Sequence, residues 1–431
     1  MVNMAGQIRR VKNFARENPI TARFALDGLL TGSALSLASS NHNLFMKRLG
    51  ADDYQLSLVL FLPQMFNLLV LIPGGLLTDS LRNRRRMVTV TLVVSAFGYL
   101  LGSLSPFTAA YSIPFFLGSI SLASGATALY NIAWQSSFPG LVDTDSRNRV
   151  LTWRTHAYVF ISMVMPLLAG AVLACIRTVN GKIIGHQGFF LCTTLLFLLN
   201  AYNFHRFQTV PAAGAQADGP KHISLSELTK AGKSLLRNRP FLLFAGAALF
   251  FHMTWHVDWT LYFIGQVSYL HMNEFLLGLA VVGSSVAQLL TLKLWSRMNE
   301  RFGVVLPFTI GILGLSLCPL YVIAAVSMPH GIGPYFFLVF HTAVHASAGI
   351  ITLNLFQCLL KTTDETYRGF SMSVFACLIC LSNAVMPVLG VALYHTLGGN
   401  LTGFRFTYGI VFVLRIAAAG LWLLHWREQS H

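Results

Sequence analysis

Residues 54–86 read YQLSLVLFLPQMFNLLVLIPGGLLTDSLRNRRR, an uncharged apolar run followed by one acid and a cluster of arginines. The uncharged part, residues 54–77, is longer than the ~20 helical residues that cross ~30 Å of hydrocarbon. Arginines collect in cytoplasmic loops beside transmembrane helices. The stretch therefore predicts a membrane-spanning helix whose second end, near Arg84, Arg85 and Arg86, lies in the cytoplasm.

Apolar runs of this kind recur along all 431 residues. The chain is 55% hydrophobic and only 10% charged, whereas a soluble domain is about 25% charged. The runs are too long and too continuously apolar for the ~10-residue alternating strands of a membrane barrel. We therefore predict an all-α membrane protein with twelve transmembrane helices, near residues 22–45, 54–77, 87–106, 110–135, 151–176, 187–205, 241–268, 272–295, 304–328, 333–359, 370–395 and 403–426.

The charge distribution predicts the orientation. Most of the 30 Lys and Arg residues fall in cytoplasmic loops if both termini are cytoplasmic, as the positive-inside rule requires. Because these residues form short clusters between apolar runs, we expect no nucleic-acid partner despite the net charge of +15. The six cysteines lack zinc-ligand spacing and are expected to be buried thiols. Short loops without appended domains favour a multi-pass protein of a plasma membrane, most simply a bacterial inner membrane.

The chain divides into two related halves. Residues 207–239 predict a cytoplasmic linker with an amphipathic helix near 223–236, between an N-terminal half, 1–206, and a C-terminal half, 240–431. Residues 7–17 are basic and amphipathic, which predicts an interfacial helix rather than a signal peptide. Equivalent positions in the halves differ by 221 in three places, which indicates an internal repeat: Pro19 and Pro240, Asp79 and Glu300, Pro166 and Pro387.

The loop after the second predicted helix carries a motif. Its sequence, Gly75-Leu-Leu-Thr-Asp79-Ser-Leu-Arg-Asn-Arg84-Arg85-Arg86, resembles the signature of the major facilitator superfamily, and Ser296-Arg-Met-Asn-Glu300-Arg301-Phe-Gly303 keeps part of it in the second half. Ser80, Arg82 and Asn83 depart from the family pattern. The resemblance covers essentially the whole chain and implies two pseudo-symmetric six-helix halves around a central cavity.

Such loops can act as gates, because a carboxylate beside arginines can pair in one conformation and separate in another. The resemblance implies this role for the two motif copies, and Arg149 and Arg368, each four residues after an aspartate, occupy similar loops. The alternative is that the arginines only fix the topology. The expected gating residues are Gly75, Asp79, Arg84, Arg85, Arg149, Glu300, Arg301, Gly303 and Arg368.

Polar side chains inside the predicted spans are candidates for function because they are costly in hydrocarbon. The resemblance implies that the first, fourth, seventh and tenth helices line the cavity. His252 and His256, like His341 and His345, are four residues apart and share a helix face. The expected substrate-binding residues are His252, Trp255, His256, Trp259, His341, His345, Asn131, Gln135 and Asn41.

The histidine cluster has three interpretations. Imidazole titrates near neutral pH, so the cluster could couple transport to protons, with Asp27, Asp258 and His256 as carriers. The paired histidines could instead bind a transition metal or a metal chelate. In the third interpretation they only hydrogen-bond between helices. Asp27 itself is either a structural acid or a proton carrier. We expect Arg415 to pack or snorkel, and Arg154 with His156 to be interfacial.

The sequence therefore predicts a secondary active transporter of a small organic or amphipathic solute, working by alternating access and coupled to protons. Transport of a metal or chelate is the first alternative, and a non-transporting sensor or lipid scramblase on the same fold is the second. No esterase elbow, phosphate-binding loop or zinc-protease motif occurs, so we expect no enzyme and no cofactor. The expected partners are a small-molecule substrate, protons and the lipid bilayer, and we expect a monomer.

Overall fold

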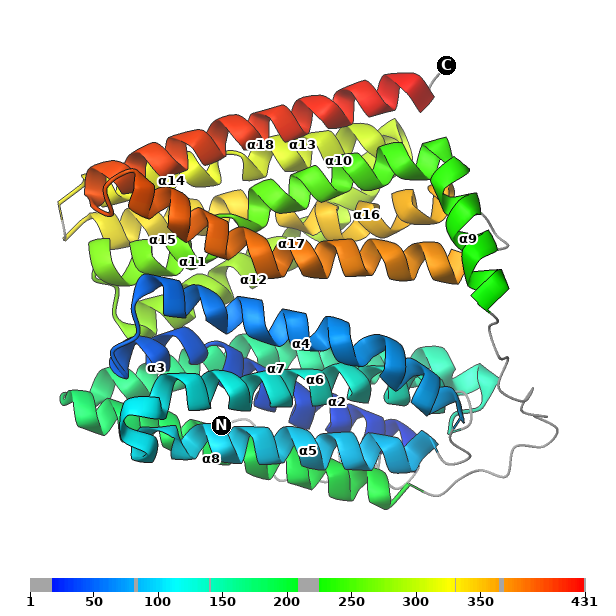
Figure 1. Cartoon of the computed structure of the whole chain (residues 1–431), viewed down its shortest axis with the longest axis horizontal. Coiled ribbons are helices and arrows are strands. Elements are labelled where there is room, and N and C mark those ends of the chain that lie inside the picture. Colours follow the sequence, from blue (N-terminus) through cyan, green and yellow to red (C-terminus); the bar gives the residue numbers. More distant parts are fainter. Residues whose placement is uncertain are drawn as a thin grey trace, which may run out of the picture. The chain divides into compact units, whose positions relative to one another are not determined.

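The computed structural model describes residues 18–80, 84–138, 141–207, 225–329, 331–363 and 368–429. Within these ranges the chain is helical and contains no strand. It forms two compact units (Figure 1): unit 1 comprises Met1–Gly50 and Phe66–Lys221, and unit 2 comprises Ala51–Met65 and His222–His431. The expected interfacial helix at residues 7–17 lies outside the described residues.

The helices of unit 1 are long and mostly continuous. α2 (Pro19–Ser39) packs against α7 (Arg147–Cys175) and α8 (Val179–His205), and α5 (Arg84–Leu104) packs against α6 (Ser112–Ser137) and α8. A short helix, α3 (His42–Arg48), follows α2, and the later part of α4 (Asp53–Ser80) also belongs to this unit. Fully buried phenylalanines fill the core, among them Phe24, Phe116, Phe190, Phe197 and Phe204.

Unit 2 contains both long helices and short helical pieces. They are α9 (Leu225–Arg237), α10 (Arg239–His256), α11 (Trp259–Ile264), α12 (Glu274–Phe302), α13 (Val305–Leu315), α14 (Cys318–Ser327), α15 (Gly333–His345), α16 (Ala348–Thr362), α17 (Arg368–Thr396) and α18 (Leu401–Gln429). The start of α4 is held in this unit, since His395 lies 3.3 Å from the Asp53 carboxylate and stacks on Tyr54.

All twelve predicted spans fall on helices. By length and apolar composition, ten described stretches could cross a membrane. One of them, Arg86–Ser137, contains two of the predicted spans, and the first predicted span is α2 with α3. The all-α membrane fold is thus confirmed, and its helix count is compatible with twelve.

Three predicted spans of unit 2 are each broken near the middle. The break between α10 and α11 lies at Val257, whose carbonyl closely faces Gly390 of α17: a Cβ on that glycine would meet this oxygen at 1.8 Å. The second break lies between α13 and α14, where Pro319 stands at the start of α14. The third break lies between α15 and α16. There, Thr291 and Trp295 donate hydrogen bonds of 3.0 and 2.9 Å to the carbonyl of Ala346. Side chains from neighbouring helices thus stabilise the interrupted backbone.

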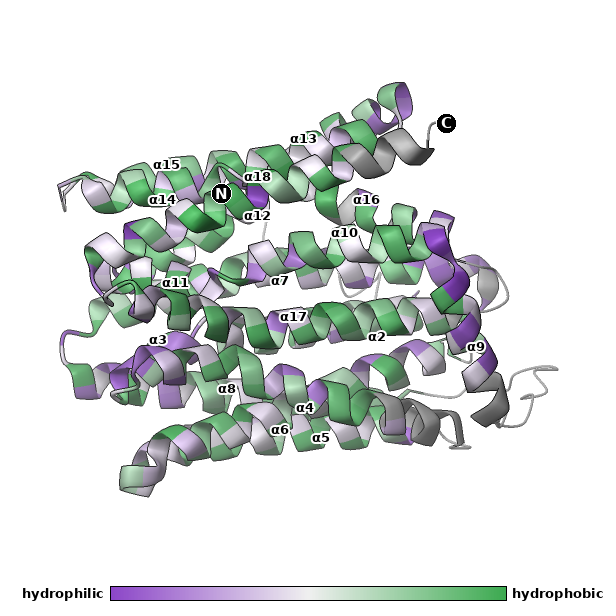
Figure 2. Cartoon of the chain, turned by 45° about the horizontal axis from the view of Figure 1, so that its top comes forward, coloured by the Kyte–Doolittle hydropathy of each residue, from purple (hydrophilic) through white to green (hydrophobic). Residues whose placement is uncertain are grey.

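The predicted amphipathic helix at 223–236 corresponds to α9, Leu225–Arg237. Ala231 and Leu235 are buried, while Lys230 and Lys233 on the other face are exposed. Figures 1 and 2 show this strongly polar helix running across the ends of the longer helices of unit 2. Such a helix suits the membrane surface.

Two glycines allow α2 and α7 to pack closely. A Cβ on Gly28 would lie 2.2 Å from the carbonyl oxygen of Arg154, and one on Gly32 would lie 2.7 Å from Ile161. Gly28→Ala should therefore destabilise the protein by about 1–3 kcal/mol, because backbone has to move to relieve the overlap. The measurement is thermal unfolding in detergent.

Gly118→Ala in α6 is the matched control, since a Cβ there meets nothing within 4 Å. It should leave stability unchanged or raise it by up to about 1 kcal/mol, the helix-propensity gain of alanine over glycine. Equal melting temperatures for the two variants would refute the close packing of α2 on α7.

Candidate functional site

A cavity of about 520 Å³ lies within unit 2. Four of its residues, at positions 252, 255, 256 and 259, follow the spacing of one helix face across the α10–α11 break. No Asp, Glu, Lys or Arg contributes to its lining, so the cavity combines hydrogen-bonding and aromatic groups without a formal charge. Its lining residues are His252, Trp255, His256, Trp259, Gln288, His345, Ala348, Ile351, Leu355, Leu359 and Phe375.

The two histidines of the first pair, His252 and His256, differ in their hydrogen-bond partners. Nδ1 of His256 lies 3.1 Å from Oγ of Ser382, and its ring lies 4.6 Å from that of Trp259. Both ring nitrogens of His252 are buried and have no hydrogen-bond partner among the described residues. A buried polar atom without a partner is costly. His252 therefore lines the cavity with a ring whose donor and acceptor are both unmet.

The second pair is divided between the cavity and the core. Nδ1 of His345 donates a 2.9 Å hydrogen bond to the carbonyl of His341, which leaves Nε2 as the acceptor of the neutral ring. His341 does not line the cavity. Its Nδ1 contacts the hydroxyls of Tyr262 and Tyr321, the latter at 3.1 Å, and its ring stacks on Phe337. Of the four histidines expected to bind substrate, His252, His256 and His345 thus line the cavity and His341 does not.

Asp258 lies at the α10–α11 break in a buried ion pair. Nη2 of Arg415 in α18 donates a 2.8 Å hydrogen bond to Asp258, and Nε donates to the carbonyl of Thr254 at 3.2 Å. Nη1 also donates to the carbonyl of Leu315 at 3.3 Å. The side chains of Arg415 and Asp258 are only 7% and 3% exposed. Of the two roles expected for Arg415, packing inside the bundle is the one observed, and the packed side chain is the cation of a buried ion pair.

Asp27 of unit 1 is fully buried and accepts four hydrogen bonds. Nε of Arg154 in α7 donates one of these bonds at 2.6 Å, so Arg154 points into unit 1 and pairs with a buried acid. Its guanidinium lies 3.9 Å from the ring centre of Trp134 and is 15% exposed. The other donors, from α6, α8 and α2, are Tyr130 at 2.6 Å, Asn200 at 2.7 Å and Thr31 at 3.2 Å.

The remaining polar candidates lie elsewhere. Asn41 is buried at the start of α3, where its amide donates to the carbonyl of Leu37 at 2.6 Å, a local structural contact. Asn131 and Gln135 are exposed together on one face of α6. None of the three lines the cavity of unit 2.

The described gating candidates lie at helix ends. Glu300 and Arg301 are exposed at the end of α12, and Gly303 caps that helix with a φ of +74°, which favours glycine. Arg149 is exposed and donates to Oγ of Ser146 at 3.4 Å. Hydrogen bonds from Ser146 lower the pKa of the neighbouring Asp143 carboxyl, so this loop stays charged at neutral pH. The other gating candidates lie on helices, but the structure does not describe their side chains. They are Gly75, Asp79, Arg84, Arg85 and Arg368.

The metal interpretation lacks a geometry in the described part of the chain. There, no group of three or more His, Cys, Asp or Glu side chains is arranged to hold a metal ion. His341 is occupied by tyrosines, and His256 by Ser382. Three of the four histidines in the two pairs thus contact hydroxyl groups or backbone.

Comparisons with known proteins agree with the fold. The model of the Major Facilitator Superfamily matches residues 25–267 and 257–431, and no curated protein matches the sequence. Among solved structures, the nucleoside transporter NupG has a TM-score of 0.73 at 11% identity, covering 94% of this chain and 99% of that one. A bacterial homologue of the iron transporter ferroportin, facing inward, has a TM-score of 0.71 at 14% identity, covering 94% and 98%. A D-xylose-proton symporter has a TM-score of 0.68 at 16% identity, covering 94% and 96%.

Proposed function

Because the chain belongs to the Major Facilitator Superfamily, we propose that it is a secondary active transporter that moves a small amphipathic organic solute by alternating access. The matched family and the similar structures are transporters, not enzymes. The similar structures carry solutes as different as a nucleoside, a sugar and iron, so the substrate class has to come from the cavity.

The observation that carries the proposal is the cavity with an unpartnered histidine. A hydrogen-bonding solute would give His252 the partner that it lacks, while Trp255 and Trp259 offer flat surfaces on which a ring could stack. The uncharged lining disfavours a strongly charged solute, because nothing there would compensate its lost hydration. A neutral or weakly acidic molecule with an aromatic or other apolar ring fits these properties best.

Proton coupling is proposed for Asp27 in place of a carrier role shared by Asp27, Asp258 and His256. Both side chains of the Asp258–Arg415 pair are buried, which suits a structural role. Arg154, by contrast, is partly exposed, so a proton or water can approach its pair with Asp27. Protonation of Asp27 would weaken that pair and let α2 and α7 shift relative to each other.

The proposed topology has both termini in the cytoplasm of a bacterial inner membrane, since this arrangement collects most basic residues on one side. The exposed charges Glu300 and Arg301 would then lie at the cytoplasmic rim, where a gate is expected. The transporter is proposed to act as a monomer.

A thermal-stability screen with His252→Ala tests the substrate site. The probes are nucleosides, aromatic monocarboxylates, aromatic alcohols and Zn²⁺, added to purified protein at two pH values. Loss of a buried hydrogen bond worth about 1–3 kcal/mol should weaken binding of an organic hit by about 5- to 150-fold. The hit is then loaded into proteoliposomes to measure accumulation.

His156→Ala is the matched control, because that histidine is exposed on α7 in the other unit. A hit that stabilises all three proteins equally would contradict the cavity as the binding site. Stabilisation by Zn²⁺ alone, lost in His252→Ala, would favour the metal alternative. Binding of an organic hit without accumulation would favour a sensor.

A further inference from the structure

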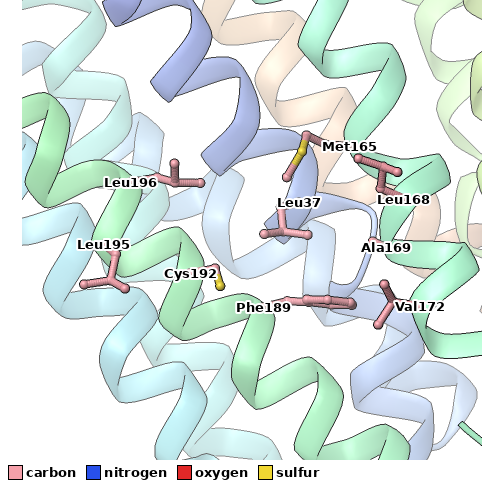
Figure 3. Close-up of a pocket in the computed structure, with 9 residues that line it drawn as sticks. All are labelled: Leu37, Met165, Leu168, Ala169, Val172, Phe189, Cys192, Leu195 and Leu196. Atoms are coloured by element: carbon pink, nitrogen blue, oxygen red, sulfur yellow. The ribbon is translucent and has the colours of Figure 1, made fainter.

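Unit 1 contains a second cavity of a different chemical kind. It is an apolar groove of about 370 Å³ between α7 and α8, with Leu37 of α2 at its base (Figure 3). Met165, Leu168 and Val172 enter it from α7, and Phe189 and Cys192 from α8. All nine lining side chains are apolar or, for Cys192, weakly polar. The groove therefore offers dispersion contacts and almost no hydrogen bonding.

The two helices approach closely at one end of this groove. A Cβ on Gly185 of α8 would lie 3.0 Å from Leu173 and 3.2 Å from Ile176, so glycine permits the contact beside the α7–α8 turn. Farther from the turn, Pro166 cannot donate the helical hydrogen bond to Ser162. There the lining residues Leu168 and Leu195 are 53% and 59% exposed. The groove is thus narrow beside the turn and open sideways along the spans.

The groove faces a hydrophobic surrounding, because α7 and α8 are both membrane-spanning stretches. A polar ligand would lose its hydration there without compensation. A lipid acyl chain in the bilayer has no hydration to lose. The groove between Met165 and Val172 extends over about two helical turns, or ~10 Å.

A positive charge lies at the end where a lipid headgroup would sit. Lys182 is seven residues before Phe189, which places both on one side of α8 about two turns apart. Arg177, in the turn itself, is exposed. We propose that the groove binds an acyl chain of an anionic phospholipid whose phosphate contacts Arg177 and Lys182.

Lipid retention by the full-length protein tests this proposal. Cys192→Trp should fill the groove and reduce several-fold the fraction of purified protein that carries phospholipid in native mass spectrometry. Leu191→Trp is the matched control, because Leu191 is 44% exposed on α8 but does not line the groove. It should retain lipid as the wild type does. Equal retention by both variants overturns the proposal, as does a dimer that only Cys192→Trp disrupts.

The headgroup is tested with Arg177→Gln and Lys182→Gln combined. Phosphatidylglycerol should raise the melting temperature of the wild type more than phosphatidylcholine does. Its apparent affinity should fall about fivefold for each cation removed. An unchanged preference in the double variant contradicts the proposed phosphate contact.

A measurement on the unmodified chain covers the case in which Cys192→Trp does not fold. The expectation of buried thiols is wrong for Cys192 and Cys175, which are both exposed and free, and only Cys192 lines the groove. Phosphatidylglycerol should slow alkylation of Cys192 by N-ethylmaleimide several-fold more than alkylation of Cys175. Equal slowing of both thiols overturns the proposal.

Discussion

Arg415→Met is expected to destabilise the protein by about 3–5 kcal/mol, because it leaves the buried carboxylate of Asp258 without its cation. The side chains of both residues are almost fully enclosed. The arginine also donates to the carbonyls of Thr254 and Leu315, so its loss leaves a backbone acceptor unsatisfied near the α10–α11 break and another at the end of α13. The measurement is the melting temperature of the purified protein, with retained monodispersity as a second readout.

A double-mutant cycle separates the ion pair from the packing of the arginine stem. Asp258→Asn combined with Arg415→Met should recover part of the lost stability, because no unpaired charge then remains. Arg297→Met removes a cation from an exposed position of α12 and should leave the melting temperature unchanged. A melting temperature of Arg415→Met equal to that of Arg297→Met would contradict the buried pair.

Asp27→Asn is expected to reduce proton-driven accumulation of the solute by tenfold or more, while exchange of solute across the membrane continues. Asparagine keeps the shape of the side chain but cannot carry the proton. It also turns an amide N–H₂ toward donors such as Arg154 and Asn200, so a moderate loss of stability should accompany the loss of coupling.

Proteoliposomes separate the two activities. Accumulation is measured under an imposed pH gradient, and exchange is measured as counterflow without one, using the solute found in the His252→Ala screen. Asp52→Asn is the control, since Asp52 is exposed and accepts a local hydrogen bond from the backbone of Gln55. Gradient-driven accumulation by Asp27→Asn at the wild-type level would rule out Asp27 as the proton carrier.

The sequence predicts the helices well and their interruptions poorly. Hydropathy stays high across the breaks at Val257 and Ala346, because those residues are themselves apolar. What interrupts the helices is contact with other elements: Gly390 approaches one break, and Thr291 with Trp295 hydrogen-bonds the other. Such contacts join positions far apart in the chain, so no local pattern announces them.

The site shows the same division. Spacing by four residues predicts correctly that His252 and His256 share a face, and both line the cavity. It cannot predict that Tyr262 and Tyr321 hold His341 behind it. Arg154 is expected at the interface only because it lies near the start of a predicted span. Its partner Asp27 lies 127 positions away, so the pairing depends on how the helices pack.

The hydrogen bonds around Asp27 also set an order of events during biosynthesis. The carboxylate depends on Asn200, which is 173 positions later in the chain. At a synthesis rate of about 5–20 residues per second, roughly 10–35 s separate the two residues at the ribosome. During that interval Thr31, on the same helix, is the first donor present, and Tyr130 and Arg154 are made before Asn200. The set of donors around this acid is therefore complete only when α8 has been made and packed against α2.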